Sequence, residues 1–341
     1  MQLSDFDYEL PEELIAQHPT TKRDSSRMLI VDRCTRTWRD LEFTSLPDYL
    51  NAQDVLVLNN TKVFPARLIG ERSPTGGAVE LLLLREVEPN IWSALARPAR
   101  RLTNGTRINF SGSRLKAEVI DSLDNGERLI RFESARPLEE ILDEIGQTPL
   151  PPYIKRQSGE LSEDRARYQT IYASERGAIA APTAGLHFSR EIFEQIQAKV
   201  VEITLHVGYG TFEPIREIDL RRHRVAPEYF SINDEAARTI NRAREAGGRV
   251  VAVGTTTTRA LESSAVDGTL CAGSGYADLT ILPGYDFRIV DALLTNFHLP
   301  RSSLLLLVSA FAGRELTLAA YRHAVRKGYR FYSYGDCMLI L

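Results

Sequence analysis

Residues 249–263 read RVVAVGTTTTRALES, and the pattern of these side chains decides the class of fold. The apolar run at 249–253 is typical of a buried strand, and the residues from 257 onward have the spacing of a helix. We therefore predict a strand at 249–253 and a helix at 257–265. A strand followed at once by a helix is the repeating unit of layered α/β domains.

The same alternation continues on both sides of this unit. Asp234 is a suitable N-cap and Gly247 a suitable stop for the helix that precedes it. The run that begins at residue 302 is apolar on nearly all sides, which indicates a buried helix. The expected elements are strands at 28–31, 54–58, 199–207, 279–282 and 338–341, and helices at 235–246, 302–311 and 316–326.

Residues 63–132 interrupt the alternation with short β-type runs and almost no helical period. Such runs, separated by turn residues, are typical of a sandwich or a small closed barrel, and closure removes exposed strand edges. A helix is expected at 137–145. We therefore predict an α/β layered main domain, a mixed sheet with flanking helices, that carries an inserted small antiparallel β-barrel domain. The predicted segments are 1–66 and 151–341 for the main domain and 67–150 for the barrel.

Composition excludes several classes of protein. The chain has 341 residues, and 42 Lys and Arg against 45 Asp and Glu give a formal net charge of -3. A broadly basic nucleic-acid binder is thereby excluded, although a local basic patch is not. Three scattered cysteines without a CxxC pair argue against disulfides and thiolate zinc sites and favour a reducing compartment. The N-terminus is no secretory signal, and the most apolar stretch, 304–312, is too short to span a bilayer. We expect a cytoplasmic monomer.

The residues alone indicate a few candidate sites. Neither a GxGxxG loop after a strand nor a phosphate-binding Walker loop occurs, and no motif indicates a metal site. The threonines before the helix at 257–265 would place hydroxyls and free N–H groups at a helix N-terminus, which suits an anionic ligand. The alternative is that Thr255 and Thr256 merely cap the helix. Arg97, Arg100 and Arg101 are a candidate phosphate-binding cluster, or equally a solvated face.

His187 and His298 lie beside Gly, Pro or Asn breaks, where loops and element ends are expected. Functional residues concentrate in loops, and histidine exchanges protons most easily near neutral pH. The alternative for each is a hydrogen-bonded structural imidazole. From the residues alone, the chain is a two-domain protein with polar candidate loops in its second half.

Ten strings along the whole chain carry a family resemblance. The chain resembles the S-adenosylmethionine:tRNA ribosyltransferase-isomerase family of queuosine biosynthesis, and no single string would suffice for this. The strings are FDYELPEELIAQHP (6–19), RDSSRMLIVDR (23–33), DVLVLNNTKVFPARL (54–68), LPPYIKR (150–156), RYQTIYA (167–173), AAPTAGLHF (180–188), HVGYGTFEPI (206–215), VAVGTTTTRALES (251–263), PGYDFRIVDALLTNFHLPRSSLLLLVSAF (283–311) and YRFYSYGDCMLI (329–340).

The resemblance implies a reaction at the wobble base of tRNA, in the anticodon stem-loop. The ribosyl part of S-adenosylmethionine is transferred to 7-aminomethyl-7-deazaguanine and rearranged to epoxyqueuosine, while adenine and methionine leave. S-adenosylmethionine is thus a cosubstrate, and no prosthetic group or metal is implied. Proton-transfer steps suit His or a carboxylate. The candidates are His187 and His298 with Asp291 as their orienting partner for catalysis, and Thr183, Thr255, Thr256, Arg259, Asn296, Asn60 and Arg67 for substrate binding.

One segment departs from the family pattern. Val225 and Ala226 stand where the family usually has Met and a second His, whereas His223 and Glu228 are present. We therefore expect no catalytic role for this segment. Two other functions stay open, a S-adenosylmethionine-dependent RNA methyltransferase and a non-catalytic RNA-binding protein. The missing glycine-rich loop argues against the first, and the low basic content argues against the second.

Overall fold

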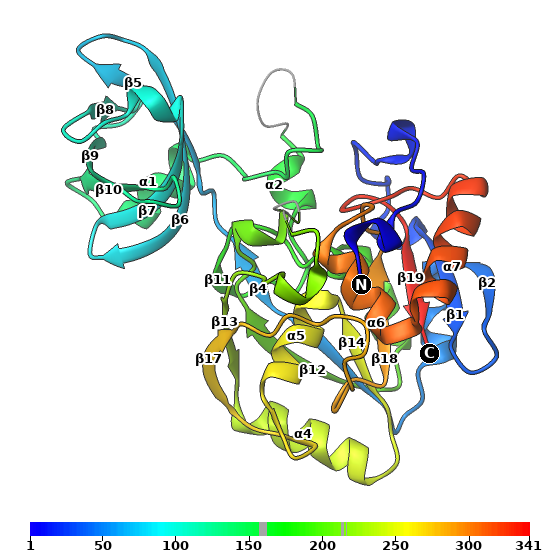
Figure 1. Ribbon diagram of the computed structural model, residues 1–341. Coiled ribbons are helices and arrows are strands. Elements are labelled where there is room, and N and C mark those ends of the chain that lie inside the picture. Colours follow the sequence, from blue (N-terminus) through cyan, green and yellow to red (C-terminus); the bar gives the residue numbers. More distant parts are fainter. Residues whose placement is uncertain (157–161, 213–214, 216) are drawn as a thin grey trace.

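The computed structural model describes residues 1–156, 162–212, 215 and 217–341. Figure 1 shows a large main domain with a barrel standing to one side of it, joined to the main domain through two stretches of chain. The predicted fold class is confirmed, because the main domain is a mixed sheet covered by helices and the insertion is a closed antiparallel barrel.

Nine strands of the described chain form the main sheet. Four parallel neighbours make its centre. Antiparallel pairs extend it on one side, and on the other side β19 and β1 form a further parallel pair between two antiparallel ones. The central strands read as continuous apolar runs because helices or loops cover both faces. In sheet order the strands are β17 (Gly273–Ala277), β13 (Glu228–Ile232), β12 (Lys199–Leu205), β3 (Val55–Asn59), β14 (Val250–Val253), β18 (Ala292–Asn296), β19 (Cys337–Ile340), β1 (Arg27–Asp32) and β2 (Thr37–Glu42).

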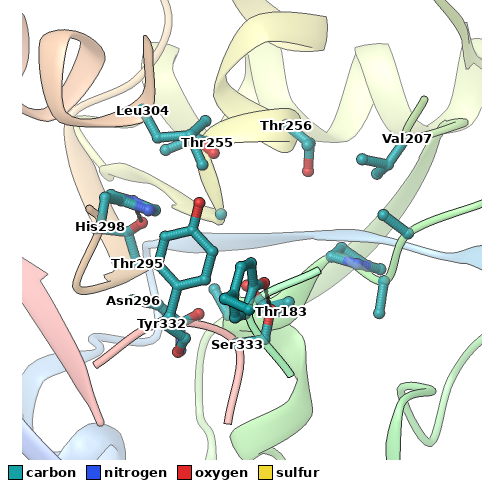
Figure 2. Close-up of a pocket in the computed structure, with 16 residues that line it drawn as sticks. Thr183, Val207, Thr255, Thr256, Thr295, Asn296, His298, Leu304, Tyr332 and Ser333 are labelled. Atoms are coloured by element: carbon teal, nitrogen blue, oxygen red, sulfur yellow. Dashed lines mark hydrogen bonds between the residues drawn. The ribbon is translucent and has the colours of Figure 1, made fainter. Parts of the chain in front are cut away.

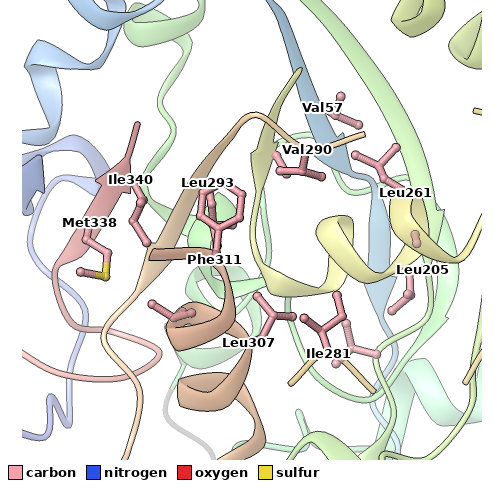
Figure 3. Close-up of a cluster of buried hydrophobic side chains, with 14 of the residues drawn as sticks. Val57, Leu205, Leu261, Ile281, Val290, Leu293, Leu307, Phe311, Met338 and Ile340 are labelled. Carbon is pink, nitrogen blue, oxygen red and sulfur yellow. The ribbon is translucent and has the colours of Figure 1, made fainter. Parts of the chain in front are cut away.

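Helices pack on this sheet through their apolar faces. The buried helix predicted at 302–311 is confirmed as α6, and α7 follows it after a sharp bend. Figure 3 shows side chains of α5 and α6 meeting those of the central strands. No single helix among the described residues is long and apolar enough to cross a membrane. The helices are α2 (Asp164–Arg167), α3 (Arg190–Gln195), α4 (Asp234–Glu245), α5 (Thr255–Ser263), α6 (Ser303–Ala312) and α7 (Arg314–Arg326).

The barrel lies within residues 67–133, all of which the structure describes. Its strands close in the order β10-β7-β6-β5-β8-β9, and alternate side chains such as Leu68, Leu81 and Ile130 fill the interior. A small barrel of this size holds a packed core and no channel. Gly70 is required where β5 meets β8, because an added Cβ would lie 2.8 Å from the Asn109 carbonyl oxygen. The strands are β5 (Arg67–Ser73), β6 (Ala78–Glu88), β7 (Ile91–Arg97), β8 (Arg107–Asn109), β9 (Lys116–Ser122) and β10 (Arg128–Glu133).

The neck of the barrel is closed by a pair of backbone hydrogen bonds between Arg67 and Gln147, of 3.2 and 2.8 Å. Helix α1 (Leu138–Ile145) covers the barrel core just before this pair. The short strands β4 (Thr61–Val63) and β11 (Glu175–Ala178) then pair in parallel beneath it. The division of the chain at residues 66 and 150 stays a prediction.

The structure corrects several predicted elements. Residues 279–282 form no strand. Their apolar side chains pack against the main core from an irregular segment, and the Leu279 carbonyl accepts a hydrogen bond from the Arg259 side chain. Helix α5 begins at Thr255, two residues earlier than expected, directly after Gly254 turns the chain at φ +95°. The N-cap of α4 is Asn233, whose side chain accepts from the Ala236 N–H at 2.8 Å, and not Asp234. Strands β13, β17 and β18 were not predicted.

Candidate active site

A pocket opens where the four parallel strands end. Residues at or just beyond the carboxyl ends of β12, β14 and β18 line it, at the edge of the sheet where α/β proteins bind ligands. It encloses about 510 Å³, and Figure 2 shows its labelled side chains facing a common centre. We call it the α5 pocket. Its polar and aromatic lining residues are Tyr153, Thr183, Thr255, Thr256, Thr295, Asn296, His298, Tyr332 and Ser333.

The N-terminus of α5 forms one wall of this pocket. Thr257 and Thr258 turn their hydroxyls back to the carbonyls of Val253 and Gly254, at 2.6 and 3.1 Å. The side chains of Thr255 and Thr256 line the pocket instead. The first N–H groups of a helix lack partners within the helix, and its dipole is positive at this end. This wall therefore favours a carboxylate or another anion.

His298 lies just beyond β18 and also lines the pocket (Figure 2). Its Nε2 is 2.9 Å from the Thr295 hydroxyl, and the Tyr321 hydroxyl is 3.2 Å from its backbone N–H. Tyr8 donates a hydrogen bond to its carbonyl. Because only 5% of His298 is exposed, burial lowers the pKa of its imidazole to about 3. The ring is neutral at physiological pH and can accept a proton.

Asn296 connects this pocket to His187. Its amide nitrogen lies 3.2 Å from His187 Nε2 and 3.1 Å from the Tyr332 carbonyl. Because a carbonyl accepts only, the nitrogen must face Tyr332, and this fixes the orientation of the amide. Asn296 Oδ1 is then left buried without a hydrogen-bond partner in the described chain. An unsatisfied buried acceptor beside a pocket is a place for a ligand N–H or O–H donor.

His187 lines a neighbouring cavity of about 260 Å³, the His187 pocket, rather than the α5 pocket. Its Nδ1 is 2.8 Å from the Ser26 hydroxyl. Burial, with smaller contributions from the positive charges of Arg330 and Arg23, lowers the pKa of His187 to about 3. His298 and His187 therefore line different cavities. Asn296 lines the α5 pocket and contacts the His187 imidazole, and Ser333 lines both the α5 pocket and the His187 pocket.

Two tyrosines supply the aromatic part of the lining. The rings of Tyr153 and Tyr332 meet edge to face, with centroids 3.8 Å apart and planes at 89°. Tyr332 adopts a φ of 73°, which costs a residue with a side chain roughly 1 kcal/mol or more and indicates a functional constraint. The Tyr153 hydroxyl contacts the Ser333 hydroxyl at 2.5 Å. Such a wall can hold a cationic group against aromatic faces.

The structure brings together part of the predicted site. Thr183, Thr255, Thr256, Asn296 and His298 line the α5 pocket. The pocket residues Tyr153, Thr295, Tyr332 and Ser333 were not predicted from the sequence. The run of aromatic and basic residues at 321–336, YRHAVRKGYRFYSYGD, was the available signal for Tyr332.

Asp291 does not reach either imidazole. It precedes β18, so the whole strand separates it from Asn296 and His298. Its carboxylate accepts from the Val250 N–H at 2.8 Å, and its carbonyl accepts from Arg33. The structure therefore corrects the expected pairing: Asp291 contacts Val250 and neither His187 nor His298.

Three further candidates are engaged elsewhere. Arg259 is buried in an ion pair with Glu228 and also donates to the Ala277 carbonyl, at 2.5 and 2.7 Å. Asn60 binds Thr204 and Glu202 on β12, whereas its neighbour Asn59 reaches Thr256 at 3.4 Å. Arg67 forms an ion pair with Glu80 in the barrel, and the exposed cluster Arg97, Arg100 and Arg101 also lies there.

The segment that departs from the family pattern lines a second cavity. Val225 and Ala226 border about 460 Å³ of space together with His223 and the Arg259–Glu228 pair. His223 Nε2 is 2.8 Å from the Ser303 hydroxyl. Leu304 borders both this cavity and the α5 pocket, so the two are neighbours. Residues 213 and 214 of the motif at 206–215 lie outside the described residues.

Acid should destabilise the fold through His187 and His298, its two most deeply buried histidines. Their folded pKa of about 3 lies below the ordinary value of 6.5, so only the unfolded state binds protons between these values. Their contribution to the free energy of unfolding is therefore fully present above pH 6.5 and is lost as the pH falls toward 3. When the pH is lowered from about 7.5 to about 5, the free energy of unfolding should fall by about 2 kcal/mol for each histidine. Urea titrations at the two pH values measure this, and a flat profile would contradict it.

These features define a class of protein. A polar pocket at the carboxyl ends of parallel strands, with a helix N-terminus, a neutral buried imidazole and an aromatic wall, is the site of an α/β enzyme acting on a polar ligand. A sequence model of the family described as queuosine biosynthesis protein matches residues 3–340. The chain belongs to this family, and the resemblance carried by the ten strings is confirmed.

A solved structure agrees. The crystal structure of S-adenosylmethionine tRNA ribosyltransferase from Thermotoga maritima is 36% identical to this chain, with a TM-score of 0.57. The match covers 99% of this chain and 100% of that one. The similarity therefore includes both the main domain and the barrel.

Proposed function

We propose that this enzyme transfers and isomerises the ribosyl moiety of S-adenosylmethionine onto 7-aminomethyl-7-deazaguanine at the wobble position of tRNA. The product is epoxyqueuosine-tRNA, and adenine and methionine are released. Family membership and the similarity to a tRNA ribosyltransferase support the reaction class. The observation that carries the assignment to a site is the lining of the α5 pocket, which combines a helix N-terminus, a buried imidazole and two tyrosine rings.

The donor fits this pocket by its charges. Its carboxylate matches the N-terminus of α5, where Thr255 and Thr256 add hydroxyl donors. Its sulfonium matches the faces of Tyr332 and Tyr153, because a cation is attracted to an aromatic ring. Asn296 Oδ1 offers a buried acceptor for an N–H or O–H group of the donor. S-adenosylmethionine is thus bound as a cosubstrate.

Chemistry begins with removal of a proton from the ribose carbon beside the sulfonium. His298 is the proposed proton acceptor, with its Nε2–H donating to Thr295 and its Nδ1 lone pair left for the substrate. A base of such low pKa is weak. The positive sulfur compensates for this, because it acidifies the adjacent carbon. Burial of the pocket also keeps water from the ring-opened intermediate.

His187 is the second proposed proton-transfer residue. Its Nε2 faces the Asn296 amide, so in the resting enzyme it holds Asn296 in place. The His187 pocket gives this imidazole a route to the second substrate. Adenine departure and loss of a proton from the attacking amine each need such a group.

We further propose that the enzyme acts as a cytoplasmic monomer on the anticodon stem-loop of tRNA. A target base in a single-stranded loop can be splayed out of the stack and bound in a pocket. Two of the cysteines are exposed and free, which suits a reducing compartment. Arg97, Arg100 and Arg101 remain candidates for phosphate contact on the barrel.

The small-molecule products test the reaction. Incubation of the enzyme with S-adenosylmethionine and precursor tRNA should release free adenine and methionine in equal amounts. Chromatography of the reaction mixture measures them. Release of S-adenosylhomocysteine instead would establish a methyltransferase, and binding of RNA without turnover of the donor would establish a binding module.

A further inference from the structure

A basic groove lies at the junction of the main domain and the barrel. It encloses about 1170 Å³, and we call it the junction groove. Its cations come from β4, α2, β11, α3 and the short helix at Arg23–Ser25, and the one carboxylate among its described lining residues comes from α1 beside the barrel. Figure 1 shows β4, β11 and α2 together where the chain passes to the barrel. The charged lining residues are Arg23, Lys62, Arg165, Arg176, Arg190 and Asp143.

The groove carries more positive charge than its own carboxylate can balance. Asp143 pairs with Arg176 at 2.9 Å and with Arg165 at 3.8 Å. Lys62 and Arg190 are exposed and have no ion-pair partner within the described chain. This concentration is local, since the whole chain has a net charge of -3. A positively charged concave surface attracts a polyanion and raises its rate of association.

The groove adjoins the cavities of the candidate site. Arg23 borders both the junction groove and the His187 pocket, and Ser333 borders both the His187 pocket and the α5 pocket. The Arg23 guanidinium donates to the carbonyls of Ala166 and Leu186 at 2.8 and 3.3 Å. The His187 pocket therefore lies between the junction groove and the α5 pocket and shares a wall residue with each. Arg97, Arg100 and Arg101 are not among the described residues that border the groove.

We propose that the junction groove binds the phosphate backbone of the tRNA anticodon arm and that the His187 pocket admits the target base toward the α5 pocket. This inference rests on the proposed function, which supplies the RNA. Lys and Arg contact phosphates without regard to sequence, whereas a base turned out of the loop needs an adjoining cavity. The arrangement offers both, a basic groove and an adjoining cavity.

The double variant Lys62→Ala/Arg190→Ala tests the groove. Both side chains are exposed, so their loss leaves the fold unchanged. The dissociation constant of an anticodon stem-loop RNA, measured by fluorescence anisotropy, should rise about 10-fold. The slope of log affinity against log salt concentration should become shallower, as expected for the loss of about one to two phosphate contacts. Affinity for S-adenosylmethionine by calorimetry and turnover at saturating RNA should stay at the wild-type values.

A matched control is Arg238→Ala/Arg242→Ala, which removes two exposed charges from α4, far from the groove in Figure 1. It should leave RNA affinity unchanged. Wild-type RNA affinity in the groove variant, or an equal loss in the control, would overturn the inference. So would a loss confined to the triple variant Arg97→Ala/Arg100→Ala/Arg101→Ala. Absence of ribosyl transfer by the wild-type enzyme would instead refute the proposed function, whatever the groove variant does.

Discussion

The His298→Ala variant should form epoxyqueuosine at least about 100-fold more slowly than the wild-type enzyme, as expected for loss of a general base. His298 is the imidazole that lines the α5 pocket, together with the N-terminus of α5. Without it no imidazole of the described residues lines this pocket. Single-turnover assays on precursor tRNA, with donor affinity measured separately by calorimetry, give the rate of the chemical step.

Two comparison variants sharpen this test. Thr295→Val removes the 2.9 Å contact to His298 Nε2 but keeps the imidazole, so it should cause a smaller loss of rate. His187→Ala should also abolish turnover, because it removes the second proposed proton-transfer residue. It also leaves Asn296 without its imidazole contact. Near wild-type turnover by folded His298→Ala would show that the base is another group, and the same result for His187→Ala would remove that residue from the mechanism.

The Arg259→Met variant should lower the free energy of unfolding by about 3–5 kcal/mol, because it leaves a buried carboxylate without its cation. Only 8% of the Arg259 side chain and 3% of the Glu228 side chain are exposed. Arg259 also donates to the carbonyls of Ala277 and Leu279. It thereby ties β13 and β17 to the loop after them. Urea denaturation followed by circular dichroism measures the loss.

A double-variant cycle separates this ion pair from simple packing. Removing both charges in Arg259→Met/Glu228→Gln should cost less than the sum of the two single variants, because no uncompensated charge remains. Additive losses would show that the two side chains act independently. A loss below about 1 kcal/mol for Arg259→Met, the value typical of an exposed pair, would contradict the buried ion pair.

Most of the fold could be predicted because its signals are local. The apolar runs that became β1, β3, β12, β14 and β19, and the helix patterns of α4, α6 and α7, each lie within a few consecutive residues. Strand β17 reads GSGYA and has little intrinsic preference for a strand. It is extended because it pairs with β13, a contact that no local pattern encodes. The segment 279–282 is the converse case, an apolar run that packs on the main core without forming a strand.

The site was predictable where its residues follow strands directly. Thr255 and His298 occupy positions just beyond β14 and β18, and their strings could be interpreted one at a time. The aromatic wall could not be predicted, because Tyr153 contacts Ser333 and Tyr332 from a distant part of the chain. The ion pair of Arg259 was not predictable for the same reason. Its partner Glu228 lies on β13, far from α5 in the sequence, and no local pattern shows that the pair is buried.

The most direct test of the account uses S-adenosylmethionine labelled with ¹³C in its ribose carbons. Precursor tRNA treated with the enzyme and this donor should yield, after digestion, a modified nucleoside whose mass includes every labelled ribose carbon. His298→Ala should yield none at the same time point. Labelled carbon that stays in S-adenosylhomocysteine, with an unlabelled methyl group gained by the tRNA, would contradict ribosyl transfer in the α5 pocket.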